Sequence, residues 1–191
     1  MMAGLQKLGL VTVHVSSRIL GENQVLIASR PSCVIGDVSE PTTTPAATVN
    51  FLHVVLPDIE IVGMRAPAYS RRTELDDYWQ KMETLITRTA TQRIVFIGDM
   101  NCNPERVGFP GGRVLKGLRE AGWHVPSPGG DWSYISKNGE TTARIDHVIA
   151  SPALTIVSAN YIRRINDVIL AGQTSDHAIS DHAALVVDVK V

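Results

Sequence analysis

The chain has 191 residues, of which 44% are apolar and 19% are charged, and its formal net charge is −1. This length predicts one domain over residues 1–191, and the apolar fraction excludes a disordered polypeptide. A net charge near zero excludes a global positive field, so strong non-specific binding to nucleic acid is not expected. Of the 18 basic residues, 13 are Arg. Arg suits bidentate phosphate contacts, although a genomic bias toward Arg codons explains the excess equally well.

Segments that would place the chain outside the cytoplasm are not evident. No apolar run approaches the roughly 20 residues of a membrane helix, and no cleavage site follows the short apolar stretch near the start. The two cysteines, Cys33 and Cys102, do not form a disulfide framework or a structural zinc site. A reducing, cytoplasmic setting is therefore predicted.

The first half of the chain alternates short apolar runs with turn residues. Strands are predicted over Leu10–Val15, Val25–Ser29, Cys33–Val38, Asn50–Leu56 and Ile59–Met64. A Pro/Thr loop, Ser39–Ala47, interrupts them, and Pro57-Asp58 is typical of a hairpin turn.

Two helices and four further strands are predicted in the rest of the chain. Apolar residues recur at helical spacing from Leu75 to Ile86, with Thr73 and Asp76 as a capping box and Trp79 as a packing residue. The second helix covers Gly112–Ala121. The strands are Arg93–Ile97, Ile145–Ala150, Thr155–Tyr161 and Ala183–Val191. The pattern indicates an α/β or α+β fold.

Polar side chains gather at the ends of these strands. Asp99 and Asn101 follow the Arg93–Ile97 strand, Asp146 and His147 lie within the Ile145–Ala150 strand, and Asp181 and His182 precede the last strand. Each alone is explained by a turn, a cap or a satisfied hydrogen-bonded pair. Together they suit phosphoryl transfer, because Asp and Asn oxygens are ligands for Mg²⁺ or Mn²⁺ and an Asp can hold a His in one tautomer.

Three motifs contain these polar residues. They are IGDMNCNP at 97–104, RIDHV at 144–148, and SDH at 180–182 before the terminal apolar strand. In order and spacing they resemble the motifs of the endonuclease/exonuclease/phosphatase superfamily, which includes DNase I, abasic-site endonucleases and sphingomyelinases. The resemblance extends from about Val25 to the C-terminus. It implies a DNase I-like four-layer sandwich of two packed mixed β-sheets flanked by helices. The first core strands of that fold are expected to be lacking, so the domain is expected to be incomplete at its N-terminus.

The resemblance also implies roles for individual residues. Asp99 would orient or deprotonate the attacking water, and Asn101 would hold a phosphate oxygen. Asp146 would pair with His182, which would stabilise the pentacovalent phosphate. Asp181 would lie in a site for Mg²⁺ or Mn²⁺.

Other assignments stay open. Arg65 is the candidate for a further phosphate contact, and its alternative is a surface residue continuing the Arg71-Arg72 cluster. A second Ser-Asp-His triplet, 175–177, lies five residues upstream of the first choice. We prefer Asp181 and His182 because a strand follows them directly. Trp132 and Tyr134 precede the RIDHV motif, and packing is the preferred interpretation for both.

The start of the chain departs from the superfamily pattern. Relatives begin with strands that carry an Asn and a Gln-Glu pair, and that Glu is a principal metal ligand. Glu22 and Glu60 are the nearest carboxylates here, and neither has the required context. A late start codon, a fragment or a degenerate copy would each explain the difference.

The predicted function is therefore a metal-dependent phosphoesterase acting on a nucleic acid or a small phosphorylated molecule. The alternative is an impaired remnant that binds a phosphate ligand or a protein. The sequence sets no oligomeric state.

Overall fold

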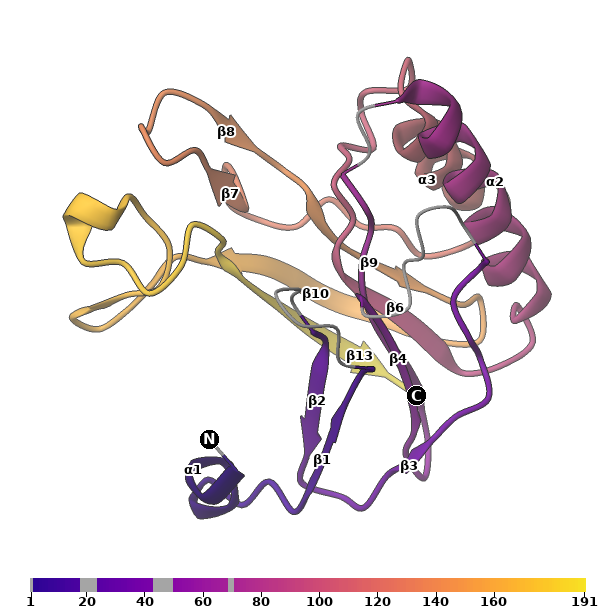
Figure 1. Ribbon diagram of the computed structural model, residues 1–191. Coiled ribbons are helices and arrows are strands. Elements are labelled where there is room, and N and C mark those ends of the chain that lie inside the picture. Colours follow the sequence, from indigo (N-terminus) through magenta and orange to yellow (C-terminus); the bar gives the residue numbers. More distant parts are fainter. Residues whose placement is uncertain (1, 18–23, 43–49, 69–70) are drawn as a thin grey trace.

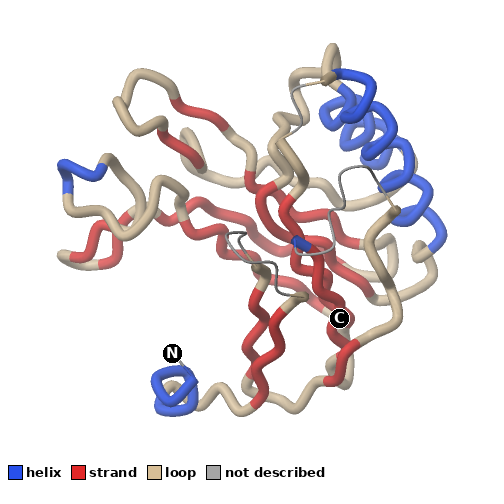
Figure 2. The backbone as a smooth tube through the Cα atoms, in the orientation of Figure 1, coloured by secondary structure: helices blue, strands red, loops and turns tan. Residues whose placement is uncertain are grey.

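The computed structural model describes residues 2–17, 24–42, 50–68 and 71–191, and its elements are shown in Figures 1 and 2. The helices are α1 (Met2–Lys7), α2 (Arg72–Arg88), α3 (Pro110–Glu120) and a 3-10 turn, η2 (Thr174–Asp176). The strands are β1 (Thr12–Val15), β2 (Leu26–Ser29), β3 (Val34–Ile35), β4 (Phe51–Val55), β5 (Glu60–Arg65), β6 (Ile94–Asp99), β7 (Tyr134–Ile135), β8 (Thr142–Ala143), β9 (Asp146–Ala150), β10 (Thr155–Ile162), β11 (Arg164–Ile165), β12 (Val168–Ile169) and β13 (Ala184–Lys190).

A five-stranded mixed sheet lies at the centre of the molecule, in the order β3-β4-β5-β6-β9. The β5–β6 pair is parallel, and the other three pairs are antiparallel. The parallel pair requires a crossover connection, and α2 supplies it.

Helices α2 and α3 cover one face of this sheet, on the right in Figure 1. Alternation along β6 explains the packing, since Ile94 and Phe96 belong to the cluster under the helices while Val95 belongs to a cluster on the opposite face. Trp79 lies in the helical cluster with 2% of its surface exposed, which confirms its packing role.

The opposite face packs against a second layer of strands. There β10 and β13 form an antiparallel pair, and the β1–β2 hairpin contacts β4. Inward-facing Leu185, Val187 and Val189 of β13 pack against Val95 and Val148 of the central sheet. The α/β fold with packed sheets is thereby confirmed. Within the described ranges, both long helices lie on the outer face of the central sheet.

Several local predictions are confirmed. The Pro57-Asp58 turn joins β4 and β5, with the Leu56 N–H donating to the Ile59 carbonyl at 3.0 Å. Gly122 ends the second helix with φ +90°, a conformation that suits glycine.

The predicted capping box is wrong. The helix begins two residues earlier than the box requires, with Arg71 at the N-cap and no side-chain cap bond, so Thr73 lies within the first turn. Asp76 instead forms an ion pair with Arg113 of α3 at 2.8 Å.

Other elements are shorter than predicted or were not predicted. The Cys33–Val38 strand is reduced to the exposed pair Val34–Ile35, and residues 43–47 of the predicted loop lie outside the described residues. Helix α1 and the hairpins β7–β8 and β11–β12 were not predicted. The strands of these hairpins have two residues each, which is too short to show a periodic pattern. Among the described residues, none of the helices is long and apolar enough to cross a membrane.

Candidate active site

Four distant chain segments meet at one end of the strands of the central sheet. Asp99 ends β6 and pairs with Asp146 at the start of β9. Arg65 ends β5 and pairs with Asp99 in the parallel register. The residues just before β13 complete the group, because His182 contacts Asp146. The parallel register and the antiparallel register together place these polar side chains side by side.

Gly98 allows Asp99 to reach this position. Its φ is +144°, and a Cβ atom built there would lie 1.9 Å from the Met64 carbonyl oxygen of β5. A side chain would therefore push β5 and β6 apart directly beside Asp99. This close approach explains the glycine of the Gly-Asp motif.

Asp99 is held in a buried and polar environment. Its side chain is 13% exposed, Oδ1 accepts the Asn101 N–H at 2.9 Å, and Oδ2 lies 3.4 Å from Arg65 Nε. Burial raises the pKa of Asp99, the Asn101 N–H opposes that shift, and the charge of Asp146 adds to it. A raised pKa makes this carboxylate a better proton acceptor than an exposed aspartate.

Asn101 adopts a left-handed conformation, with φ +46°. Asn tolerates this region better than most residues, which suits its position directly after the strand. Its Nδ2 donates to the Ala66 carbonyl at 2.6 Å. The bond fixes the amide plane and leaves the second Nδ2 hydrogen for another acceptor.

His182 and Asp146 form the best-defined pair of the site. The distance from His182 Nδ1 to Asp146 Oδ2 is 2.9 Å, and the side chains are 28% and 13% exposed. The hydrogen bond from Asp146 raises the pKa of His182, although burial of the ring opposes it. Because His182 Nδ1 bonds to Asp146, Nε2 is the ring nitrogen that can face a ligand.

Three residues that sequence reasoning did not assign to the site hold this pair. The Ser133 hydroxyl accepts the Asp146 N–H at 3.1 Å, and the Tyr161 hydroxyl donates to the Asp146 carbonyl at 2.7 Å. The Tyr134 ring lies 5.1 Å from the His182 ring, so it contacts the site as well as packing. Only the nearness of Ser133 and Tyr134 to the RIDHV motif could have indicated them.

The remaining candidates differ in how closely they join the site. Asp181 is half-buried, and its charge helps to raise the pKa of His182. Arg65 reaches Asp99 with a 42% exposed side chain. His177 of the other triplet is exposed on the loop after η2, whereas His182 meets Asp146.

His147 and Glu60 bond to structural partners and do not take part in the site. His147 is 1% exposed, and its Nε2 lies 2.9 Å from the Cys102 carbonyl and 3.0 Å from that of Arg144. Glu60 lies at the opposite end of β5 from Arg65 and pairs with His53 at 3.0 Å. Glu22 lies outside the described residues.

The carboxylates of the site test whether it suits a divalent cation. Asp146 is bound to His182, and Asp99 is bound to Arg65 and the Asn101 N–H, which leaves Asp181 as an oxygen donor. Across the described part of the chain, no three His, Cys, Asp or Glu residues form a group that could hold a metal. The donor set therefore suits only an ion that takes most of its ligands from water and substrate phosphate, as Mg²⁺ commonly does.

The fold and this arrangement of side chains define the class of protein. The profile of the endonuclease/exonuclease/phosphatase family matches residues 11–182. The chain therefore belongs to the endonuclease/exonuclease/phosphatase family. No curated protein sequence matches the chain significantly.

Solved structures with the same fold include DNA-processing enzymes. An AP endonuclease from Archaeoglobus fulgidus superposes with a TM-score of 0.72 and 17% identity, and the match covers 99% of this chain and 82% of that one. The 3′ phosphatase NExo from Neisseria, bound to a product DNA hairpin, has a TM-score of 0.71, 16% identity and the same coverage. The endonuclease domain of TRAS1, a telomere-specific non-LTR retrotransposon, has a TM-score of 0.63 and 16% identity, covering 94% of this chain and 80% of that one.

Proposed function

We propose that this protein hydrolyses a phosphate ester by in-line attack of a water molecule activated at Asp99. The observation that supports this proposal is that Asp99, Asp146 and His182 lie together at one end of the strands of the central sheet. A buried carboxylate with a raised pKa and an oriented imidazole are the two groups that this reaction needs.

Each side chain then has a separate task. Asp99 takes a proton from the attacking water while the water oxygen bonds to phosphorus. The second Nδ2 hydrogen of Asn101, the Arg65 guanidinium and the His182 Nε2–H hold the phosphate oxygens. Asp146 keeps the His182 ring oriented and favours its charged form. The bond to the leaving oxygen breaks opposite the water, and that oxygen takes its proton from solvent.

A requirement for Mg²⁺ or Mn²⁺ is part of this proposal, with Asp181 as the ligand from this chain. When bound, the ion would polarise a phosphate oxygen as a Lewis acid. Because the described residues gather no group of three ligands, we expect weak binding of the ion until a phosphate is present.

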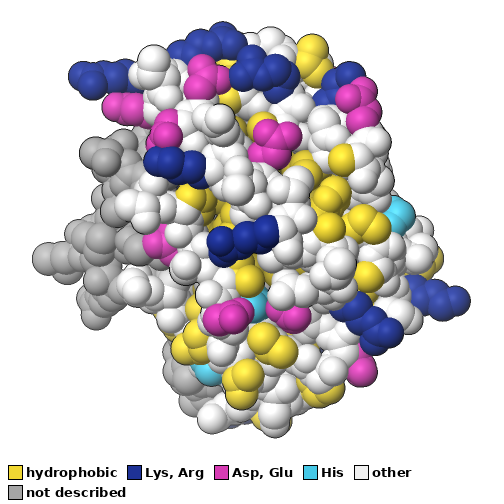
Figure 3. Space-filling view, turned by 90° about the vertical axis from the view of Figure 1, so that its right-hand side faces the viewer, with side chains coloured by type: hydrophobic (Ala, Val, Ile, Leu, Met, Phe, Trp, Pro, Cys, Tyr) yellow, Lys and Arg dark blue, Asp and Glu magenta, His cyan; other side chains and the backbone are white. Residues whose placement is uncertain are grey.

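The substrate proposed is a nucleic acid or a small phosphorylated molecule. DNA is named for one structural neighbour and two others are endonucleases, which favours a nucleotide ester. Figure 3 shows basic and acidic side chains interspersed on one face of the molecule, with no continuous basic stripe on that face. We therefore expect recognition to depend on a few local groups.

A second candidate function is supported by the same lack of a three-ligand group among the described residues. The chain would then be an impaired remnant that binds a phosphate ligand without turnover. Titration calorimetry with Mg²⁺, with and without inorganic phosphate, separates the two. Heat of Mg²⁺ binding favours the hydrolase, and phosphate binding that is indifferent to Mg²⁺ favours the remnant.

The direct test is hydrolysis of a generic phosphodiester and a phosphomonoester with Mg²⁺ or with EDTA. We expect Asp99→Ala and His182→Ala each to lower the rate by about 10²–10⁴-fold. His177→Ala is the matched control and should leave the rate unchanged, since it removes an exposed loop histidine. Activity that is indifferent to both site substitutions would reject the proposal.

A further inference from the structure

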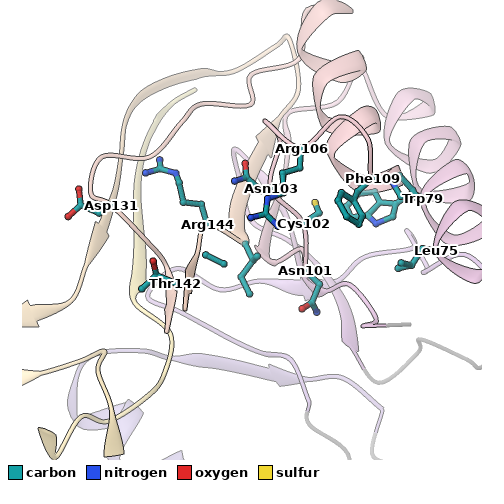
Figure 4. A pocket seen from close by; sticks show the side chains of 14 residues that line it. Leu75, Trp79, Asn101, Cys102, Asn103, Arg106, Phe109, Asp131, Thr142 and Arg144 are labelled. Carbon is teal, nitrogen blue, oxygen red and sulfur yellow. The ribbon is translucent and has the colours of Figure 1, made fainter. Parts of the chain in front are cut away.

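A cavity of about 370 Å³ opens beside the candidate active site. It lies between the N-terminal ends of α2 and α3, the loop after β6 and the strand β8 (Figure 4). This volume lies within the range of about 300–1,000 Å³ that is usual for small-molecule sites. Of the residues that line this cavity, the catalytic steps proposed above use Asn101.

One wall of the cavity is apolar and aromatic. Figure 4 shows Leu75, Trp79 and Phe109 together on the helical side. Phe109 is the N-cap residue of α3, and 55% of its surface is exposed. Gly111 permits this wall, because a Cβ atom there would lie 2.7 Å from the Trp79 ring. A large exposed aromatic ring at the rim of a cavity is a surface on which another flat group can stack.

The other wall is polar. Asp131 and Thr142 lie opposite the aromatic side, and Arg106 and Asn103 lie between the two walls (Figure 4). Arg144 also faces the cavity, but its guanidinium donates to the carbonyls of Pro128 and Gly130. The carboxylate and hydroxyl of this wall, with the Asn103 amide and the Arg106 guanidinium between the walls, match a ring with hydrogen-bonding edges better than a purely apolar chain.

The cavity is continuous with the phosphate site. Asn101 lines it and hydrogen-bonds through its backbone N–H to Asp99, and Ile145 lines it directly before Asp146. A group in the cavity therefore lies next to a phosphate held at Asn101.

We propose that this cavity binds the nucleobase of the nucleotide whose phosphate is attacked, with Phe109 as the stacking surface. The inference rests on the proposed function, because it assigns that site a nucleotide ester rather than a phosphorylated lipid or sugar. Phe109 and Leu75 provide the apolar contact, while the polar wall meets the edge of the base.

The test measures binding without hydrolysis, in EDTA, by titration calorimetry. The probes are the four deoxynucleoside 3′,5′-bisphosphates and the same deoxyribose bisphosphate without a base. We expect at least one nucleotide to bind the wild-type chain about tenfold more tightly than the base-free probe, as stacking of one base commonly provides. Equal affinity for all five probes, or binding of none, would overturn the proposal.

Two variants connect the effect to the cavity. Phe109→Ala should remove the nucleotide preference and leave the affinity for the base-free probe unchanged. Val107→Ala is the matched control, because Val107 is an exposed apolar residue of the same loop that does not line the cavity. A Phe109→Ala variant that keeps the preference would also reject the assignment.

The outcome is separable from that of the proposed function. Hydrolysis of phosphodiesters without any base-dependent binding would reject the nucleobase site alone. Base-dependent binding without hydrolysis would reject the hydrolase alone.

Discussion

The Asp146 carboxylate orients the imidazole of His182 through a single bond of 2.9 Å. Asp146→Asn replaces a charged acceptor with a neutral amide of the same shape, so it removes the charge that favours protonated His182. We expect kcat for phosphoester hydrolysis to fall by about 10²-fold with little change in fold, measured by steady-state kinetics and circular dichroism.

Asp188→Asn provides a matched control for this substitution. Asp188 is an exposed aspartate of β13 that bonds to the Ser158 hydroxyl, far along the strand from His182. Its replacement should leave kcat unchanged. An Asp146→Asn enzyme with full activity would show that His182 is held by other contacts.

His147 is a second histidine of the same motif with an entirely different role. Its Nε2 hydrogen faces two carbonyl oxygens, and its buried Nδ1 has no hydrogen-bond partner among the described residues. Burial lowers the pKa of His147 below the ordinary value of 6.5. The folded chain therefore keeps this ring neutral in a pH range where the unfolded chain protonates it.

This difference predicts how stability depends on pH. Above about pH 6.5 neither the folded nor the unfolded chain protonates His147, so this residue adds no pH dependence. Below about pH 6.5 the unfolded chain binds one more proton than the folded chain. The free energy of unfolding then falls by up to about 1.4 kcal/mol for each pH unit of acidification. His147→Gln should lower stability at about pH 8 but flatten the decline toward about pH 5. Urea unfolding across this range checks the slope, with His177→Gln as the exposed control. A slope identical to that of the wild type would contradict the prediction.

At the scale of elements, the pairing of β5 with β6 depends on Gly98. A methyl group at this position would collide with the Met64 carbonyl oxygen, and the φ of +144° is unfavourable for alanine. We expect Gly98→Ala to lower the free energy of unfolding by about 3 kcal/mol or more and to abolish hydrolysis by displacing Asp99. Urea denaturation and the phosphodiester assay measure both effects.

Gly108→Ala is the control for a general effect of glycine replacement. Gly108 lies in the loop before α3, and a Cβ atom added there would have no described atom of another segment within 4 Å. Its replacement should change stability by no more than about 1 kcal/mol. Similar losses in the two variants would indicate that the β5–β6 contact is not the cause.

The elements that could be predicted from sequence are those with long, regular patterns. The helix through Leu75 and Ile86 and the strand predicted over Arg93–Ile97 are both found, because their apolar residues reflect packing on the sheet. In the structure this strand extends to Asp99. The capping box failed because Thr73 and Asp76 match a pattern that depends on where the helix begins. The start at Arg72 depends on surroundings that the local sequence does not specify.

The candidate site was predictable to the same extent. Asp99, Asp146 and His182 could be grouped since each lies at a strand end within a recognisable motif. The support from Ser133 and Tyr161 could not, because Ser133 lies in the loop before β7 and Tyr161 lies in β10. Both reach Asp146 through tertiary contacts and not through any spacing in the chain. Tertiary contacts between distant segments have no local signal.

For the whole molecule, charge balance is as informative as the fold. Many arginines are within ion-pair distance of acidic side chains, among them Arg71 with Glu74, Arg113 with Asp76, and Arg163 with Asp131. These pairs are exposed and add little to stability, but each cancels a positive charge that would otherwise attract phosphates. With a net charge of −1, we therefore expect no broad electrostatic attraction for nucleic acid.

This balance predicts a shallow dependence of DNA binding on salt. Each phosphate contact on a single strand contributes a slope of about −0.7 to the plot of log affinity against log salt, so about three contacts give a slope near −2. We expect affinity for a single-stranded oligonucleotide, measured by fluorescence anisotropy in EDTA, to fall roughly twentyfold or less between about 50 mM and 200 mM salt.

Arg65→Ala should reduce the slope of this salt dependence by the equivalent of one phosphate contact. Arg88→Ala should leave it unchanged, because Arg88 ends α2 at the opposite end of the sheet from the site. A much steeper slope in the wild-type chain would mean that a basic surface, and not a few placed groups, holds the nucleic acid.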